Sequence, residues 1–203
     1  MKIVLLVEGK TERVFIPYLR KFLEPRLAGK PLPRLSPSVY DGRIPKEDAL
    51  RRRVELMLAG RDPATAVVAL TDVYTGTSDF KDANDARQKM AAWVGRNPRF
   101  FPHAAQHDFE AWLIPFWPTI QRLAGHNRGA PPGAPESINH GSPPSYKIKE
   151  IFRQGSCRDD YSKTRDAARI LENNDLTISA RACPELKAFL NTLLRLAGGE
   201  LLA

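Results

Sequence analysis

The chain has 203 residues, of which 42% are hydrophobic and 27% are charged. These proportions are ordinary for a globular protein and exclude an intrinsically disordered one, and the length suits one domain, with or without an appendage. Lysine and arginine together number 31 against 23 for aspartate and glutamate, and the formal net charge of +8 favours polyanionic partners.

Several other classes of protein are excluded by what the chain lacks. Cys157 and Cys183 show no CxxC or Cys/His spacing, so neither a zinc site nor a disulfide framework is expected. No apolar stretch reaches the roughly 20 residues that a membrane span needs, and the apolar start is too short for a signal peptide. We therefore expect a cytoplasmic protein with no membrane association.

The strand patterns suggest a parallel sheet. Continuous apolar runs at residues 1–7 and 64–71 predict strands that are covered on both faces. A less regular pattern at 100–106 predicts another strand, and a short edge strand is expected through residues 39–40, after a Pro-rich connection. These predicted strands alternate with helical patterns.

Helical spacing of apolar side chains predicts helices over residues 11–28, 47–58 and 82–94, and a further helix opens at Asp108. The alternation of strands and helices implies right-handed crossovers. The first part of the chain is therefore expected to be an α/β core with a parallel sheet flanked by helices.

The rest of the chain is expected to form a helical C-terminal appendage. A Gly/Pro-rich segment is too long for an ordinary connection. Beyond it, the composition is helical, and a final amphipathic helix begins at Pro184 and ends before Gly198. We divide the chain into an α/β core (1–123), a loop (124–145) and an appendage that packs on the core (146–203).

Acidic residues follow the predicted strands. Glu8 ends the first strand, Asp72 ends the second, and Glu110 lies just past the third, while Glu12 falls in the first turn of the first helix. Ligands collect at the carboxyl ends of parallel strands, so these side chains are expected to converge. Converging carboxylates must take up protons or bind a cation.

A hard divalent ion fits this cluster best. Carboxylate oxygens without thiolates favour Mg²⁺ or Mn²⁺ over zinc. Such an ion suits phosphate-ester chemistry in a basic protein. Ordinary roles compete with this interpretation: Glu12 can simply stabilise a helix start, Glu110 can cap its helix, and Asp79 lies in a turn-rich loop where aspartate is common.

Two segments resemble the Toprim domains of topoisomerases, primases and overcoming-lysogenization-defect nucleases. They are Val7-Glu8-Gly9-Lys10-Thr11-Glu12 and Leu70-Thr71-Asp72-Val73-Tyr74. Further segments resemble a bacterial Toprim-like family known as domain of unknown function 4276, at residues 107–113, 135–139, 144–145, 161–163 and 183–184. The similarity covers nearly the whole chain.

This resemblance implies a Mg²⁺-dependent nuclease-like fold, often paired with an ATPase and linked to bacterial defence against phage or plasmid DNA. Glu8 and Asp72 match the metal-binding and catalytic acids, Glu12 the second acid of the first motif, and Glu110 the acid of the third. Many Toprim domains carry a second aspartate where Tyr74 stands here. Either Asp79 substitutes for it as a metal ligand, or the site has fewer ligands.

Basic residues extend the same picture. Lys163 is the candidate for stabilising the charge that develops on the transferred phosphate. Candidates for contacting nucleic-acid phosphates are Lys10, Lys147, Lys149, Arg153, Lys163 and Arg165. Acidic residues are interspersed among them, as on an ordinary solvated helix face.

Competing hypotheses follow. The first is a Mg²⁺- or Mn²⁺-dependent phosphodiesterase that cuts DNA or RNA. The second, motivated by Tyr74, is a non-catalytic subunit that docks on an ATPase or on nucleic acid. A weaker third, a nucleotide- or flavin-binding module built on residues 75–78, lacks any Gly-rich fingerprint or Walker lysine motif. The oligomeric state is left open.

Overall fold

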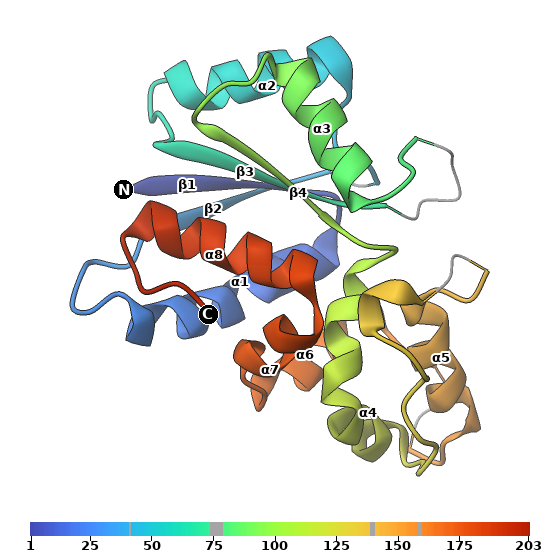
Figure 1. Ribbon diagram of the computed structural model, residues 1–203. Helices are drawn as coiled ribbons and strands as arrows, with labels where there is room; N and C mark the ends of the chain where they lie inside the picture. Colours follow the sequence, from blue (N-terminus) through green and yellow to red (C-terminus); the bar gives the residue numbers. More distant parts are fainter. Residues whose placement is uncertain (41, 74–78, 139–140, 158–159) are drawn as a thin grey trace.

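A parallel sheet forms the centre of the protein (Figure 1). The computed structural model describes residues 1–40, 42–73, 79–138, 141–157 and 160–203. Within these ranges the strand order is β2-β1-β3-β4, and every neighbouring pair is parallel. The strands are β1 (Lys2–Val7), β2 (Arg34–Val39), β3 (Ala66–Asp72) and β4 (Phe100–Ala105).

Helices cover both faces of the sheet, which explains why β1 and β3 are continuously apolar (Figure 1). Ile3 and Leu5 belong to the core on the side of α1 (Lys10–Leu23) and α8 (Pro184–Ala197). Val4 and Leu6 belong to the opposite core. That side is covered by α2 (Glu47–Ala59) and α3 (Ala83–Val94).

A second group of helices lies beyond the end of β4 (Figure 1). They connect the sheet to α8, and their side chains continue the same hydrophobic core that α1 begins. The elements are the 3₁₀ helices η2 (Phe109–Phe116) and η3 (Pro135–Ser137), and α4 (Trp117–Ala124), α5 (Pro144–Gln154), α6 (Lys163–Glu172) and α7 (Leu176–Ala182); a short 3₁₀ turn, η1 (Glu24–Arg26), follows α1.

An aromatic cluster joins the two groups of helices. The Phe15 ring of α1 lies 5.2 Å from the Phe109 ring of η2, measured between centroids, and 6.4 Å from the Phe189 ring of α8. Trp112 stacks on Phe189 at 5.9 Å. The last helix of the described chain is therefore part of the central core.

The predicted fold class is confirmed: the protein is α/β, with a parallel sheet flanked by helices and further helices at the C-terminal end. The edge strand was placed too late in the sequence, since β2 spans Arg34–Val39 and includes Pro37. An edge strand tolerates proline because one side of its backbone needs no partner. The helix expected at Asp108 begins as the 3₁₀ helix η2.

Two further sequence predictions concern the chain as a whole. The division at residues 123 and 145 stays a prediction. Over the described ranges, no helix is both long and apolar enough to cross a membrane.

Candidate metal centre

Five carboxylates gather at the carboxyl edge of the sheet. Glu8 directly follows β1, and Asp72 is the last residue of β3. Asp108 directly precedes η2, Glu110 is in the first turn of η2, and Glu12 is in the first turn of α1. All but the half-buried Asp72 are almost completely buried. The structure thus places Glu8, Glu12, Asp72 and Glu110 at one edge of the sheet, and their role as metal ligands stays a prediction.

The two glutamates of the first motif are held by their immediate neighbours. The Thr71 hydroxyl donates a hydrogen bond to Oε1 of Glu8, across from β3 to the end of β1. The Gly9 amide donates to Oε2 of Glu12 at 3.0 Å, which closes the first turn of α1. A Cβ atom at Gly9 would lie 3.3 Å from that same oxygen, so glycine suits this tight turn.

A strained turn presents the acids that follow β4. His107 has φ of +73°, in the left-handed region that residues other than glycine rarely adopt. Directly after it, Oδ2 of Asp108 accepts a hydrogen bond of 3.1 Å from the Ser145 amide at the start of α5. Oδ1 of Asp108 is buried and has no hydrogen-bond partner within the described part of the chain.

Glu110 is fully buried and paired with a cation from another element. The Lys163 ammonium, at the start of α6, lies 3.2 Å from Oε1 and 3.3 Å from Oε2 of Glu110. Burial and the charges of Glu110 and Asp108 raise the pKa of the Tyr161 hydroxyl well above its usual value, so it stays protonated. Among the ion pairs that the structure describes, the cation that contacts Glu110 is Lys163.

The acids shift one another toward protonation. Burial raises the pKa of Glu8 to about 7, with a contribution from the charge of Glu12. Burial and the charge of Asp108 raise the pKa of Glu110 to about 7. Burial and the charges of Glu12, Glu8, Asp108 and Glu110 raise the pKa of Asp72 well above its usual value. The group therefore carries unfavourable negative charge at neutral pH.

This donor set fits a hard divalent cation. The acids supply oxygen ligands, and the unpartnered Oδ1 of Asp108 is available to accept a bond. A bound cation would favour the charged forms of these acids and so offset the burial and the mutual repulsion that raise their pKa values. As the side chains stand, however, no three His, Cys, Asp or Glu residues among those described are grouped closely enough to hold a metal ion.

Asp79 lies among cations. Its Oδ2 atom is 2.7 Å from the Arg43 guanidinium and 2.6 Å from the Lys46 ammonium. Its role as a metal ligand stays a prediction, as does the consequence of Tyr74, which lies outside the described residues. Residues 75–78, the basis of the nucleotide-binding hypothesis, lie outside them too.

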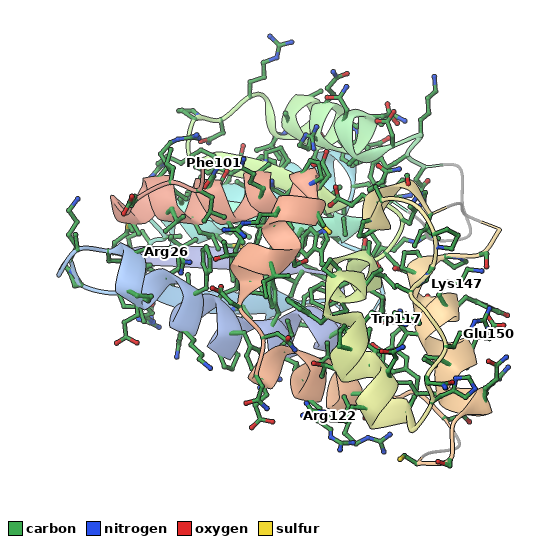
Figure 2. The ribbon with its side chains drawn as sticks, turned by 60° about the horizontal axis from the view of Figure 1, so that its bottom comes forward. Arg26, Phe101, Trp117, Arg122, Lys147 and Glu150 are labelled. Atoms are coloured by element: carbon green, nitrogen blue, oxygen red, sulfur yellow. The ribbon has the colours of Figure 1, made fainter. Side chains whose placement is uncertain are left out.

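The basic residues predicted to contact phosphates occupy different settings. Arg165 forms an ion pair of 2.8 Å with the buried Asp166, and Arg153 lies 3.6 Å from Asp160. Lys147 and Glu150 both lie on α5 (Figure 2), and both line a small hollow. Lys10 is exposed at the first position of α1, and Lys149 is half-buried on α5. Their contacts with nucleic acid stay predictions.

Asp108, Thr71 and Arg43 are parts of this region that the sequence does not predict. Asp108 follows a predicted strand much as Asp72 does, but its position is equally typical of a helix start. No signal in the sequence indicates that Arg43 approaches Asp79, because 36 positions separate them and the connection is not a regular element.

A family model described as Domain of unknown function (DUF4276) matches residues 7–194. The chain belongs to this family. Curated proteins gave no match. Among solved structures, the C-terminal region of the Burkholderia pseudomallei OLD protein aligns with a TM-score of 0.52 and 13% identity, covering 96% of the DUF4276 chain and 98% of that chain.

A second similar structure is the C-terminal region of the Xanthomonas campestris pv. campestris OLD protein. It aligns with a TM-score of 0.47 and 13% identity, covering 97% of the DUF4276 chain and 96% of that chain. At such low identity, the likeness to the Burkholderia pseudomallei structure shows a common fold. It agrees with the Toprim-like architecture expected for DUF4276.

Proposed function

We propose that this DUF4276 protein is a metal-dependent phosphodiesterase that cuts nucleic acid. The observation that carries the proposal is the convergence of buried carboxylates from three strand ends, with the pKa values of Glu8 and Glu110 raised to about 7 by burial and by neighbouring acids. The Toprim resemblance and the fold shared with OLD C-terminal regions support it.

Each residue of the site has a proposed task. Glu8, Asp72 and Glu110 hold Mg²⁺ or Mn²⁺, with Glu12 and Asp108 beside them. When bound, such an ion polarises a phosphoryl oxygen and lowers the pKa of a coordinated water. Glu8 and Asp72 fix the reacting groups by holding the ion in place.

Two neighbouring side chains support these acids. The Thr71 hydroxyl holds the orientation of the Glu8 carboxylate. The Lys163 side chain, 55% exposed, is long enough to leave Glu110 for a phosphate oxygen, where its charge stabilises the transferred group.

The wider setting is also a proposal. The positive net charge of +8 suits a nucleic-acid substrate, and the Toprim resemblance suggests an ATPase partner and a role in cytoplasmic defence against phage or plasmid DNA. The proposed contacts of Lys10, Lys147, Lys149, Arg153 and Arg165 with phosphates would make binding weaken as salt is added.

The decisive experiment compares the wild type with Glu8→Gln and Asp72→Asn. We expect Mn²⁺-dependent cleavage of plasmid DNA or of RNA by the wild type, and its loss in both variants, with unchanged circular dichroism. Glu55→Gln, at an exposed position on α2, is the matched control and should cleave normally. Titration with Mn²⁺ should show weaker metal binding in the two site variants alone.

One observation favours a second candidate, a non-catalytic subunit that docks on an ATPase or on nucleic acid. Within the described ranges, the acids are not grouped closely enough to hold a metal as they stand. Two results together would favour this second function over the first. The wild type would bind no Mn²⁺ and would leave plasmid DNA and RNA intact even with its partner. The Glu8→Gln, Asp72→Asn double variant would keep the biological activity of the wild type.

A further inference from the structure

A pair of cations lies next to the acidic site and is not part of the proposed metal centre. Arg43 and Lys46 lie in the connection between β2 and α2, and both contact Oδ2 of Asp79, at 2.7 Å and 2.6 Å. Their side chains are 35% and 41% exposed, so both cations reach solvent. Both cations contact the same carboxylate oxygen.

The pair is adjacent to the proposed metal ligands. Arg43, Lys46 and Asp79 line a narrow cleft together with Glu8 and Thr71. The guanidinium of Arg43 is near enough to Glu8 to counteract part of the rise in the pKa of that acid. A substrate that reaches Glu8 from this side would therefore meet Arg43 and Lys46.

These cations and Lys163 approach the acids from opposite faces of the sheet. The cleft of Arg43 and Lys46 is lined by Phe80 and Trp93, on the side of α2 and α3. Lys163 begins α6, whose apolar side chains belong to the core on the side of α1. A strand of nucleic acid lying across the acids would thus have positive charge on both sides. Such an arrangement suits consecutive phosphates on either side of the reacting one.

Asp79 has the chemistry of a substitute for a phosphate. Carboxylate and phosphate oxygens are both good acceptors for guanidinium and ammonium groups. The open volume of the cleft is about 10 Å³, roughly the space of one water molecule. A phosphate can therefore enter only if Arg43 and Lys46 exchange Asp79 for it.

We propose that Arg43 and Lys46 form a phosphate clamp for the nucleic-acid strand beside the metal-binding acids, and that Asp79 holds this clamp closed until a phosphate displaces it. The inference rests on the proposed function, because it presumes that nucleic acid lies across the site. It gives Asp79 a different task from the metal ligand expected from the sequence.

The test uses variants that should act in opposite directions. Arg43→Gln with Lys46→Gln removes the clamp, and Asp79→Asn releases it. Arg52→Gln with Arg53→Gln is the matched control, since it removes the same charge from exposed positions on α2. Affinity for labelled DNA and RNA duplexes of one sequence is measured by fluorescence anisotropy with Ca²⁺ across a series of salt concentrations, and Mn²⁺ affinity is measured separately.

We expect the Arg43, Lys46 double variant to bind the preferred duplex about tenfold or more weakly, with a salt dependence reduced by about one to two phosphate contacts. Asp79→Asn should bind several times more tightly than the wild type, and the Arg52, Arg53 control should change affinity much less. Mn²⁺ affinity should change much less than duplex affinity in every variant, which separates the clamp from metal binding.

Several results would overturn the clamp. If the wild type binds the duplex but the Arg43, Lys46 variant and the Arg52, Arg53 control weaken this binding equally, the clamp is wrong while the proposed function stands. If Asp79→Asn binds no more tightly, Asp79 does not hold the clamp closed; if it loses Mn²⁺ affinity, Asp79 is a metal ligand instead. If the wild type binds neither duplex, both the clamp and the proposed function fail.

Discussion

The Lys163 ammonium lies 3.2 Å from Oε1 of Glu110, and this contact joins a side chain that is 55% exposed to one that is 1% exposed. Burial alone would lower the pKa of Lys163, but the charges of Glu110, Asp72 and Asp108 raise it, so the lysine stays charged. Before any substrate binds, Lys163 supplies part of the positive charge that Glu110 and the neighbouring carboxylates require.

Replacing Lys163 should therefore destabilise the protein in a pH-dependent way. In Lys163→Met, Glu110 remains buried without its cation. Losing a partner from a buried pair costs about 3–5 kcal/mol, and exposure of the lysine reduces the expected loss here to about 1–2 kcal/mol. The loss should appear above pH 7 and disappear as the pH falls from about 7 toward 4.5, because Glu110 is then protonated in the folded state of both the wild type and the variant.

Urea unfolding of Lys163→Met at these two pH extremes measures the effect. Lys187→Met, on α8, provides a lysine control away from the acids. An equal loss of stability at both pH values would show that the Lys163 stem, rather than its charge, supports the fold.

The stability of the wild type should fall as pH rises through the acidic range. The pKa values of Glu8 and Glu110 are raised from 4.5 to about 7 in the folded protein, so the folded chain binds more protons than the unfolded chain between these values. The free energy of unfolding therefore decreases from about pH 4.5 to about pH 7 and stays low above it. Thermal unfolding across this range measures the decrease.

Added Mg²⁺ should reverse this loss. Above pH 7, Mg²⁺ at a hundred times its Kd should raise the unfolding temperature by roughly 5–10 °C, and below pH 4.5 it should have little effect. His103 changes the free energy of unfolding in the opposite direction as pH rises, because burial and the charge of Arg87 lower its pKa to about 4. Measurements in the His103→Gln variant therefore isolate the effect of the acids. A Mg²⁺ effect that is independent of pH would contradict the involvement of the acids.

Asp108→Asn should weaken metal binding while preserving the fold. The amide oxygen of asparagine can still accept the bond from the Ser145 amide that Asp108 Oδ2 accepts at 3.1 Å, but the charge is lost. We expect Mn²⁺ affinity and nuclease rate to fall about 10- to 100-fold, the range found for groups at and around a metal site. Asp175→Asn is a matched control, because Asp175 caps α7 by accepting from the Thr177 amide. Equal Mn²⁺ affinity in both variants would remove Asp108 from the site.

Phe189→Ala should destabilise the whole protein. The Phe189 ring of α8 stacks on Trp112 at 5.9 Å and meets Phe15 at 6.4 Å, so its loss leaves a cavity between α8, η2 and α1. Large core aromatics replaced by alanine cost about 3–5 kcal/mol. Urea unfolding should show one transition at lower urea concentration. Two separate transitions would indicate that the C-terminal helices unfold as an independent unit.

The sheet was predictable because its signals are local. β1 and β3 are buried on both faces, and their continuous apolar runs follow directly from that burial. The edge strand β2 was placed wrongly because Pro37 and its serine neighbours lack such a run. The acids Glu8 and Asp72 could be located from the strand ends alone.

The partners of the acids could not be predicted, because they come from distant parts of the chain. Glu110 and Lys163 are 53 positions apart, and the strained backbone at His107 that orients the turn has no counterpart in composition or periodicity. The Gly/Pro-rich loop likewise gave no hint that Glu136 accepts hydrogen bonds from the Trp112 indole and the Glu185 amide, which attach the loop to η2 and α8.

The position of α8 over the sheet has a consequence for how the protein is made. During synthesis the strands and α1 emerge before α8, so the Phe15 ring has no Phe189 to contact until α8 has left the ribosome. Until then, the apolar surface that α8 covers in the folded protein is exposed to solvent. Docking of α8, or a chaperone, is needed to keep this surface from associating with other chains.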